Sequence, residues 1–351
     1  TGNMTPRILS ITTAAFLLVG GLSAQPPRIV VQGTGAPQVF ADVNAAIAAA
    51  LPDDKLYFSG GTFIALTDVV IDKPLHLIGA GIHPDSTSVT AATTLTTATS
   101  NYNNIVITTS GSGSTFTGII FVPNGDIHYG TSNTDDDPTD LLFERCRFLV
   151  TVDVAADGGG TSSTTFEECL FHGEVNGAYP CVATFSRCIH DAAINSFGAL
   201  MVDHGVFLNC RAMNNCGGAT FTNSICTAGD YPVYQSNNII ISNCLFSGTQ
   251  IDGNGNGGVV TYTSLNVPAA GIFLNETDGN YQFTDDLHLA PGSVGIGGAN
   301  DGTDIGVYGS SSPYKPGNVP YNPHFRAANI ATATNTNGEL PLNIRVAAQT
   351  N

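Results

Sequence analysis

The chain has 351 residues, 40 of them glycine, and only 11% carry a charged side chain. A composition this poor in charge and rich in small residues is typical of an all-β protein rather than a helical one. The formal net charge of −17 leaves little basic surface for nucleic acid or an anionic membrane, so we expect neither as a partner.

Residues 1–24 have the pattern of a secretory signal peptide. Arg7 supplies a positive charge, residues 8–19 form an apolar run, and small residues lead to a cleavage point before Gln25. This order is typical of an exported protein, and the apolar run is too short to span a bilayer comfortably. We therefore expect a secreted or cell-surface protein with no membrane span in the mature chain.

Residues 28–51 predict a strand followed by a short amphipathic helix. Four apolar residues recur at helical spacing and predict a helix over residues 40–51; they are Val39, just before it, and Val43, Ile47 and Leu51. Further strands are expected around Gly60-Gly-Thr-Phe63 and Lys73-Pro-Leu-His-Leu-Ile-Gly79. This order resembles the start of right-handed parallel β-helix proteins of the pectin-lyase-like superfamily. The resemblance covers roughly residues 28–310, and it implies that the helix caps the first coil.

One short phrase returns seven times between Phe116 and Phe246. It consists of a large apolar residue, two spacers, a small residue or cysteine, one spacer and, usually, another apolar residue. Phe143-Glu-Arg-Cys-Arg-Phe148 is a clear copy. Side chains of a strand alternate between its faces, so inward residues three apart require one residue that breaks the alternation. The residue before the small position is Gly118, Arg145, Glu168, Arg187, Asn209, Asn223 and Asn243 in successive copies.

Glycine and asparagine tolerate a positive φ, so each phrase predicts a strand, a left-handed corner and a second strand. A period near 20 residues then predicts coils stacked about 4.8 Å apart. The step from Phe207 to Phe221 is only 14 residues, which indicates a slipped phrase or a tight corner. An ordinary β-sandwich is the alternative, but it would not place cysteine at the same position in five of seven copies.

The eight cysteines of the chain fall into two groups. Five occupy the small position of the phrase: Cys146, Cys169, Cys188, Cys210 and Cys244. Stacked coils would bring neighbouring members within disulfide range, yet unpaired cysteine also packs as a small apolar residue. We favour a column of unbonded thiols and leave a link between Cys181 and Cys216 open.

We divide the expected mature chain into a parallel β-helix with its N-terminal cap, residues 25–285, and a C-terminal part, residues 286–351. Residues 286–309 resemble the closing segment of secreted bacterial β-helix-repeat proteins. The four prolines of residues 313–325 predict an extended strap. Asn337-Gly338 predicts the turn of a hairpin.

Catalytic candidates are few. Lyases of the pectin-lyase-like superfamily imply calcium with a basic residue, and its hydrolases imply several close aspartates. Arg145, Glu168 and Arg187 would stack with alternating charge; we expect a surface charge ladder, with a catalytic Arg145–Glu168 pair as the alternative. Asp203 and His204 are the nearest acid–base pair, although one adjacent pair arises readily by chance. His190 occupies an inward slot and is expected to be packed in the core.

Two acidic turns are candidates for calcium, the one cofactor that the sequence suggests. Asp135 and Asp137 form the first, and Asp301 and Asp304 form the second. Both place oxygen ligands at the short spacing that calcium requires, but turns rich in glycine and aspartate look the same without a metal.

The leading functional hypothesis is a non-catalytic extracellular β-helix, either a surface protein or a filament subunit. Its expected partners are extracellular polysaccharide and further copies of itself, joined end to end or edge to edge. The alternative is a polysaccharide lyase or glycoside hydrolase that acts on acidic glycans.

Overall fold

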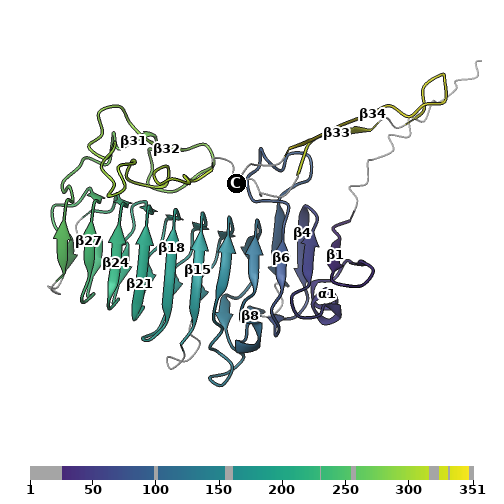
Figure 1. The fold of residues 1–351 in the computed structure, drawn as a ribbon, viewed down its shortest axis with the longest axis horizontal. Helices are drawn as coiled ribbons and strands as arrows, with labels where there is room; N and C mark the ends of the chain where they lie inside the picture. The colour runs from purple at the N-terminus through teal and green to yellow at the C-terminus, as the bar shows by residue number, and fades with distance from the viewer. Residues whose placement is uncertain are drawn as a thin grey trace, which may run out of the picture.

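The computed structural model describes residues 26–98, 102–154, 161–229, 231–253, 258–315, 324–330 and 333–347. The expected signal peptide, residues 1–24, lies outside the described residues. The chain winds into a parallel β-helix, with coils stacked along one axis (Figure 1). A single α-helix is present among the described residues. Within those residues we find no helix with the length and apolar character needed to cross a membrane.

Three sheets run along the solenoid. Sheet A consists, in spatial order, of β2 (Gln38–Phe40), β1 (Ile29–Gln32), β3 (Lys55–Phe58), β6 (His76–Ile78), β9 (Thr115–Thr117), β12 (Leu141–Glu144), β15 (Ser163–Glu167), β18 (Val182–Ser186), β21 (Ala199–Asp203), β24 (Ala219–Thr222), β27 (Ile240–Ser242) and β30 (Val259–Thr261). Sheet B consists of β4 (Gly61–Ala65), β7 (Thr93–Thr97), β10 (Ile120–Val122), β13 (Arg147–Phe148), β16 (Leu170–Phe171), β19 (Ile189–His190), β22 (Val206–Phe207), β25 (Ile225–Cys226) and β28 (Leu245–Phe246). Sheet C consists of β5 (Val69–Ile71), β8 (Ile105–Ile107), β11 (Ile127–Tyr129), β14 (Val152–Asp153), β17 (Val175–Asn176), β20 (Ile194–Asn195), β23 (Met213–Asn214), β26 (Val233–Tyr234) and β29 (Asp252–Gly253).

The core is built from columns of identical side chains. Phe116, Phe143, Phe166 and Phe185 stack with ring centroids 4.5, 5.2 and 4.8 Å apart. Each ring is almost fully buried, which contributes roughly 1.5–3 kcal/mol per side chain. Because each coil repeats the same inward residues, the hydrophobic effect fixes the register between coils.

His190 lies inside this core, as predicted. Its ring stacks between Phe171 and Phe207 at centroid distances of 4.5 and 4.4 Å. Neither ring nitrogen has a hydrogen-bond partner among the described residues, and burial lowers the pKa of His190 to about 3. The imidazole is therefore neutral and packs as an aromatic ring.

The predicted left-handed corners connect sheet A to sheet B. Arg145, Glu168 and Arg187 have φ values of 51°, 52° and 53°. We call the corner residues of successive coils the corner column; they are Gly118, Arg145, Glu168, Arg187, His204, Asn223 and Asn243.

The fifth phrase has a different register from the predicted one. Val202 pairs with both Phe185 and Phe221 and starts the coil, whereas Phe207 pairs with His190 in the next column. Val202 stands 17 residues after Phe185 and 19 before Phe221, which removes the anomalous 14-residue step. The corner residue is His204 instead of Asn209. The prediction was wrong because Phe207 is a more conspicuous start than Val202.

All eight cysteines are unbonded to one another, which confirms the expected thiols and excludes the Cys181–Cys216 link in this structure. The corrected register leaves four cysteines in the column, because Gly205 takes the place assigned to Cys210. Thiols of the column donate to the carbonyl oxygen of an earlier coil, as Cys169 Sγ does to Phe143 O at 3.3 Å. Each thiol is thus packed and satisfied without a disulfide.

The helix α1 (Val43–Ala49) is shorter than predicted. Asp42 caps its N-terminus by accepting a 2.7 Å hydrogen bond from Ala45 N. Leu51, expected on the helix, lies outside it, and Val39 and Leu51 are 63% and 64% exposed. Val43, Ala46 and Ile47 join the core, and α1 contacts β1, β2, β4 and β5.

Residues 267–315, here called the C-terminal segment, cover the outward face of sheet B. This segment contains the antiparallel pair β31 (Phe273–Asn275) and β32 (Asp286–Leu289), which lies beside the later coils in Figure 1. A second hydrophobic core forms beneath it. Sheet B contributes Leu170, Ile189, Val206, Ile225 and Leu245 to this core, and the segment contributes Ile272, Phe273, Leu287, Ile305 and Val307.

The predicted hairpin is present. β33 (His324–Ile330) pairs antiparallel with β34 (Leu342–Ala347), and Gly338 has a φ of 80° in the connection. Of the expected strap, residues 316–323 lie outside the described part of the chain.

Candidate functional site

The C-terminal segment packs along the corner column and is hydrogen-bonded to it. Asn223 and Asn300 exchange two hydrogen bonds, from Asn223 Nδ2 to Asn300 Oδ1 at 3.0 Å and from Asn300 N to Asn223 Oδ1 at 2.9 Å. One coil later, Asn243 Nδ2 donates to Gly298 O at 2.9 Å. Because the corner backbone is fixed in the left-handed region, these side chains all point to the same side.

Asp203 and His204, the predicted acid–base pair, do contact each other. His204 Nδ1 lies 3.0 Å from Asp203 Oδ2, and His204 Nε2 lies 3.5 Å from Thr303 Oγ1 of the C-terminal segment. His204 is only 2% exposed. A Cβ at Gly309 would lie 2.6 Å from His204 Cδ2, so glycine is needed there for the segment to close over the ring. The imidazole is enclosed, with both nitrogens facing protein atoms.

Asp203 is held as a carboxylate. Burial opposes its ionisation, but hydrogen bonds from His204, Thr222 and Asn223 outweigh burial and lower the pKa of Asp203. Thr222 Oγ1 and Asn223 Nδ2 donate to Asp203 Oδ1 at 2.8 and 2.9 Å. Asp203 also borders an open pocket of about 520 Å³ that Arg187, Asn300 and Asp301 help to line.

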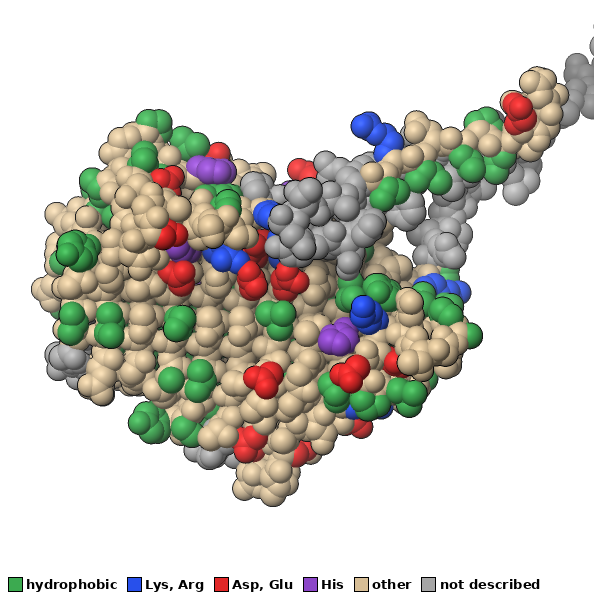
Figure 2. Space-filling model, viewed as in Figure 1, with side chains coloured by type: hydrophobic (Ala, Val, Ile, Leu, Met, Phe, Trp, Pro, Cys, Tyr) green, Lys and Arg blue, Asp and Glu red, His purple; other side chains and the backbone are tan. Residues whose placement is uncertain are grey.

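Arg145 and Glu168 form a buried ion pair, and Arg187 Nε lies 3.7 Å from Glu168 Oε1. The expected stack of alternating charges is present, but its expected place on the surface is wrong. Arg145 Nε donates to Glu168 Oε2 at 2.9 Å, and the two side chains are 0% and 1% exposed. The C-terminal segment covers the pair: Lys315 N lies 3.4 Å from Glu168 Oε2, and the neighbouring Tyr314 is 2% exposed. Charged side chains gather where this segment meets the coils (Figure 2). No local pattern around these three residues indicates that a later segment buries them.

The calcium candidates use their carboxylates within their own loops. Asp135 accepts hydrogen bonds from Thr131 and Ser132, and the bond from the Thr131 hydroxyl is the largest cause of its lowered pKa. Asp137 accepts from Thr161 N.

In the second turn, Asp301 accepts from Thr303, and Asp304 accepts from Gly297 N at 2.9 Å. Within the described ranges, no three His, Cys, Asp or Glu side chains converge as a metal site would require. Calcium binding stays a prediction.

The outward face of sheet C carries a polar ladder that the sequence analysis missed. We define it as Asp153, Asn176, Asn195 and Asn214, which occupy one register position in successive coils. Asn176 Nδ2 donates to Asp153 Oδ1, and Asn195 Nδ2 donates to Asn176 Oδ1, both at 2.8 Å. The signal was present as a repeated pair, an apolar residue and then asparagine, in Val175-Asn176, Ile194-Asn195 and Met213-Asn214.

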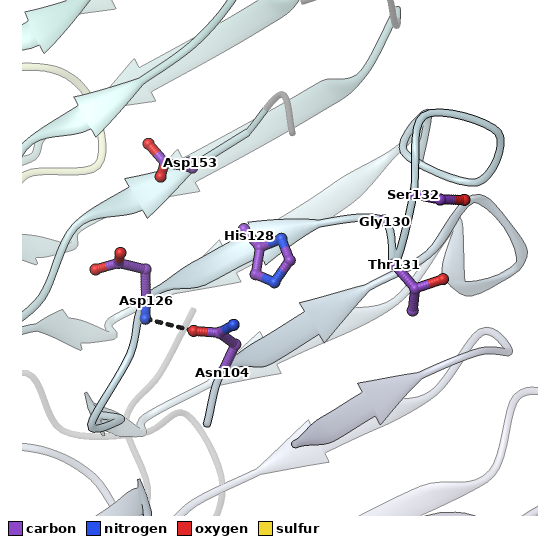
Figure 3. Close-up of a pocket in the computed structure, with 7 residues that line it drawn as sticks. All are labelled: Asn104, Asp126, His128, Gly130, Thr131, Ser132 and Asp153. Atoms are coloured by element: carbon purple, nitrogen blue, oxygen red, sulfur yellow. Dashed lines mark hydrogen bonds between the residues drawn. The ribbon is translucent and has the colours of Figure 1, made fainter. Parts of the chain in front are cut away.

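A pocket of about 370 Å³ lies at the N-terminal end of this ladder. Asp126 and Asp153 come from neighbouring coils and lie near the ring of His128 (Figure 3). Asn104 Oδ1 accepts a 2.9 Å hydrogen bond from Asp126 N. Burial, followed by the charge of Asp153, raises the pKa of Asp126. The structure thus brings together two carboxyl groups in unlike environments, neither of which was predicted.

A scan against protein-family models matches no family, and a search of curated proteins finds no relative.

Proposed function

We propose that the protein is a non-catalytic extracellular β-helix that binds an extended polysaccharide along the outward face of sheet C. The polar ladder carries this proposal. It offers an amide or carboxylate at every coil, spaced by about 4.8 Å, a repeat comparable to one sugar ring of an extended glycan. Its members are partly exposed, although Asn214 Oδ1 is itself buried and makes no hydrogen bond within the described residues.

The ladder is suited to binding because its side chains are already ordered. Hydrogen bonds between Asp153, Asn176 and Asn195 hold these side chains in place, so a ligand would cost less side-chain entropy on binding. Beyond Asn214 the register continues to Tyr234, and the Arg211 guanidinium stacks 4.3 Å from the centre of its ring.

A non-catalytic role is favoured because the predicted acid–base groups are already engaged. Arg145 pairs with Glu168, and His204 is enclosed between Asp203 and the C-terminal segment. These groups hold the segment on the corner column, and a general acid or base needs access to its substrate.

The finer assignments belong to the same proposal. Export rests on the signal-like residues 1–24, and the right-handed, pectin-lyase-like form with a helical cap rests on the resemblance of residues 28–310.

Self-association rests on the free edge of β30, the last strand of sheet A in the described chain. Val260 is 45% exposed, although its register partner Ile241 is 2% exposed, so the core is uncovered at this end.

The experiment is a paired assay on the secreted protein. Depletion from solution by insoluble polysaccharides measures binding, and release of reducing or unsaturated ends measures turnover. The proposal predicts depletion without turnover. Turnover that survives extensive purification would contradict the non-catalytic role, and the absence of depletion by every glycan would contradict the binding role.

A glycoside hydrolase is the second candidate, and the Asp126–Asp153 pocket favours it. A carboxyl with a raised pKa beside a second carboxyl group is the arrangement that acid-catalysed glycoside cleavage requires. Asp126 would be the acid, and Asp153, which accepts a hydrogen bond from Asn176, would be the base or nucleophile. This candidate predicts turnover that disappears in both Asp126→Asn and Asp153→Asn and persists in His204→Gln.

A further inference from the structure

A pocket distinct from those above lies in the turns that connect sheet C to sheet A. It has a volume of about 510 Å³, and its lining includes Tyr179, Gly198, Gly217, Asn215, Asn237 and Asn238. None of its lining residues carries a charge. The pocket borders the polar ladder, because Asn214 directly precedes Asn215 and Asn195 precedes Gly198 by three residues.

Tyr179 presents an aromatic ring in this pocket. The side chain is 77% exposed and lies against glycines of two later coils. A Cβ at Gly198 would be 3.1 Å from Tyr179 Cδ2, and a Cβ at Gly217 would be 3.5 Å from Tyr179 Cε2. The two glycines therefore leave room for the ring, and its exposed area is available to a ligand.

Three asparagine amides accompany the ring. Asn215, Asn237 and Asn238 are exposed, and within the described chain their side chains make no hydrogen bond, in contrast to Asn176 and Asn223.

Their backbone is nevertheless well anchored. Gly218 N donates to Asn237 O at 2.9 Å, and Cys216 N donates to Ser236 Oγ at 3.0 Å. The pocket thus combines a fixed floor, an exposed ring and unoccupied amides.

We propose that this pocket binds one neutral sugar residue of a polysaccharide. The C–H face of a sugar would stack on Tyr179, and the amides would donate to and accept from its hydroxyls. An uncharged lining offers no partner for a uronate, and the net charge of −17 repels one. This inference rests on the proposed glycan-binding function and names its substrate class as neutral glycan.

The test measures binding of soluble neutral oligosaccharides and of polygalacturonate to four proteins. They are the wild type, Tyr179→Ala, Tyr179→Phe and, as a matched control, Tyr262→Ala, which removes a tyrosine that is 85% exposed at the end of the solenoid. Loss of a stacking ring should weaken binding of the neutral ligand about tenfold. Tyr179→Phe should bind within about twofold of the wild type, and Tyr262→Ala should be unchanged. Saturation transfer from the ligand should reach tyrosine ring protons in the wild type and fall in Tyr179→Ala.

The possible results separate this inference from the proposed glycan-binding function. Equal neutral-glycan binding by wild type and Tyr179→Ala would overturn this inference and leave the proposed function intact. Binding of polygalacturonate alone would overturn the neutral class. Binding of no glycan by the wild type would overturn both proposals. Unchanged thermal unfolding of the three variants would show that the differences arise in the pocket.

Discussion

Sheets B and C of the same coils present outward faces of opposite character. Sheet B has apolar outward side chains, such as those of Ile189 and Ile225. The C-terminal segment covers them and forms a second core with them. Sheet C carries Asn195 and Asn214 at outward positions, and both belong to the polar ladder. The inward columns build the solenoid, whereas the outward residues decide which side closes intramolecularly and which remains available for a ligand.

The largest expected effect is on the buried ion pair beneath the C-terminal segment. Glu168→Ala would leave the Arg145 charge without its 2.9 Å partner, which costs about 3–5 kcal/mol when such a pair is broken. Urea unfolding measures the loss. Glu167→Ala is the control, because Glu167 is 36% exposed where it pairs with Arg187, and its loss should be much smaller. Equal losses would show that the segment does not seal the corner column.

A matched pair of substitutions compares the two faces directly. Ile225→Ala on sheet B should cost about 2–5 kcal/mol, because this fully buried side chain packs in the second core. Asn195→Ala on sheet C should cost about 1 kcal/mol, the net value of a typical hydrogen bond. Guanidinium unfolding of both variants checks the difference, and similar losses would contradict the contrast between the faces.

The shared core should be sensitive to acid because of His190. Its pKa in the folded chain is lowered to about 3, below the usual value of about 6.5 in the unfolded chain. The unfolded state therefore takes up a proton first, and stability falls as the pH drops from about 6.5 toward 3, by up to about 1.4 kcal/mol per pH unit. His190→Phe should remove much of this dependence. Urea midpoints of wild type and variant at several pH values between 7 and 4 test it; parallel curves would contradict it.

A smaller effect is expected at the free edge of β30. If the uncovered core at Val260 joins two copies, light scattering should show a mass that rises with concentration, and Val260→Asp should abolish the rise. The same aspartate on the exposed outward position of Ile240 is the control. A constant monomer mass for the wild type would rule out association through this end.

The inner wall was predictable because its signal is local. The apolar phrase, the left-handed corner and the cysteine column all lie within six residues, so stacked coils, unbonded thiols and the packing of His190 followed from the sequence. Among the seven copies from Phe116 to Phe246, the predicted register was wrong at the fifth, where Val202 starts the coil.

The outward faces were not predictable in the same way. Each two-residue strand has only one outward residue, such as Leu170 or Asn176. One residue shows no pattern, and the apolar or polar character of the face is visible only once the coils are stacked. Asparagine is also common in turns, so the repeated asparagines did not stand out as a ladder. The burial of Arg145 depends on Tyr314 and Lys315, far away in sequence, and no local pattern marks that contact.

The central claim is that the open face of sheet C binds an extended polysaccharide, and one comparison tests it most directly. Polysaccharide binding is measured for a variant with Asn176, Asn195 and Asn214 all changed to alanine. The control changes Thr165, Thr184 and Thr220, on the outward face of sheet A, to alanine. The account predicts that the asparagine variant remains folded but loses most of its binding, while the threonine variant binds as the wild type does. Undiminished binding by the folded asparagine variant would contradict it.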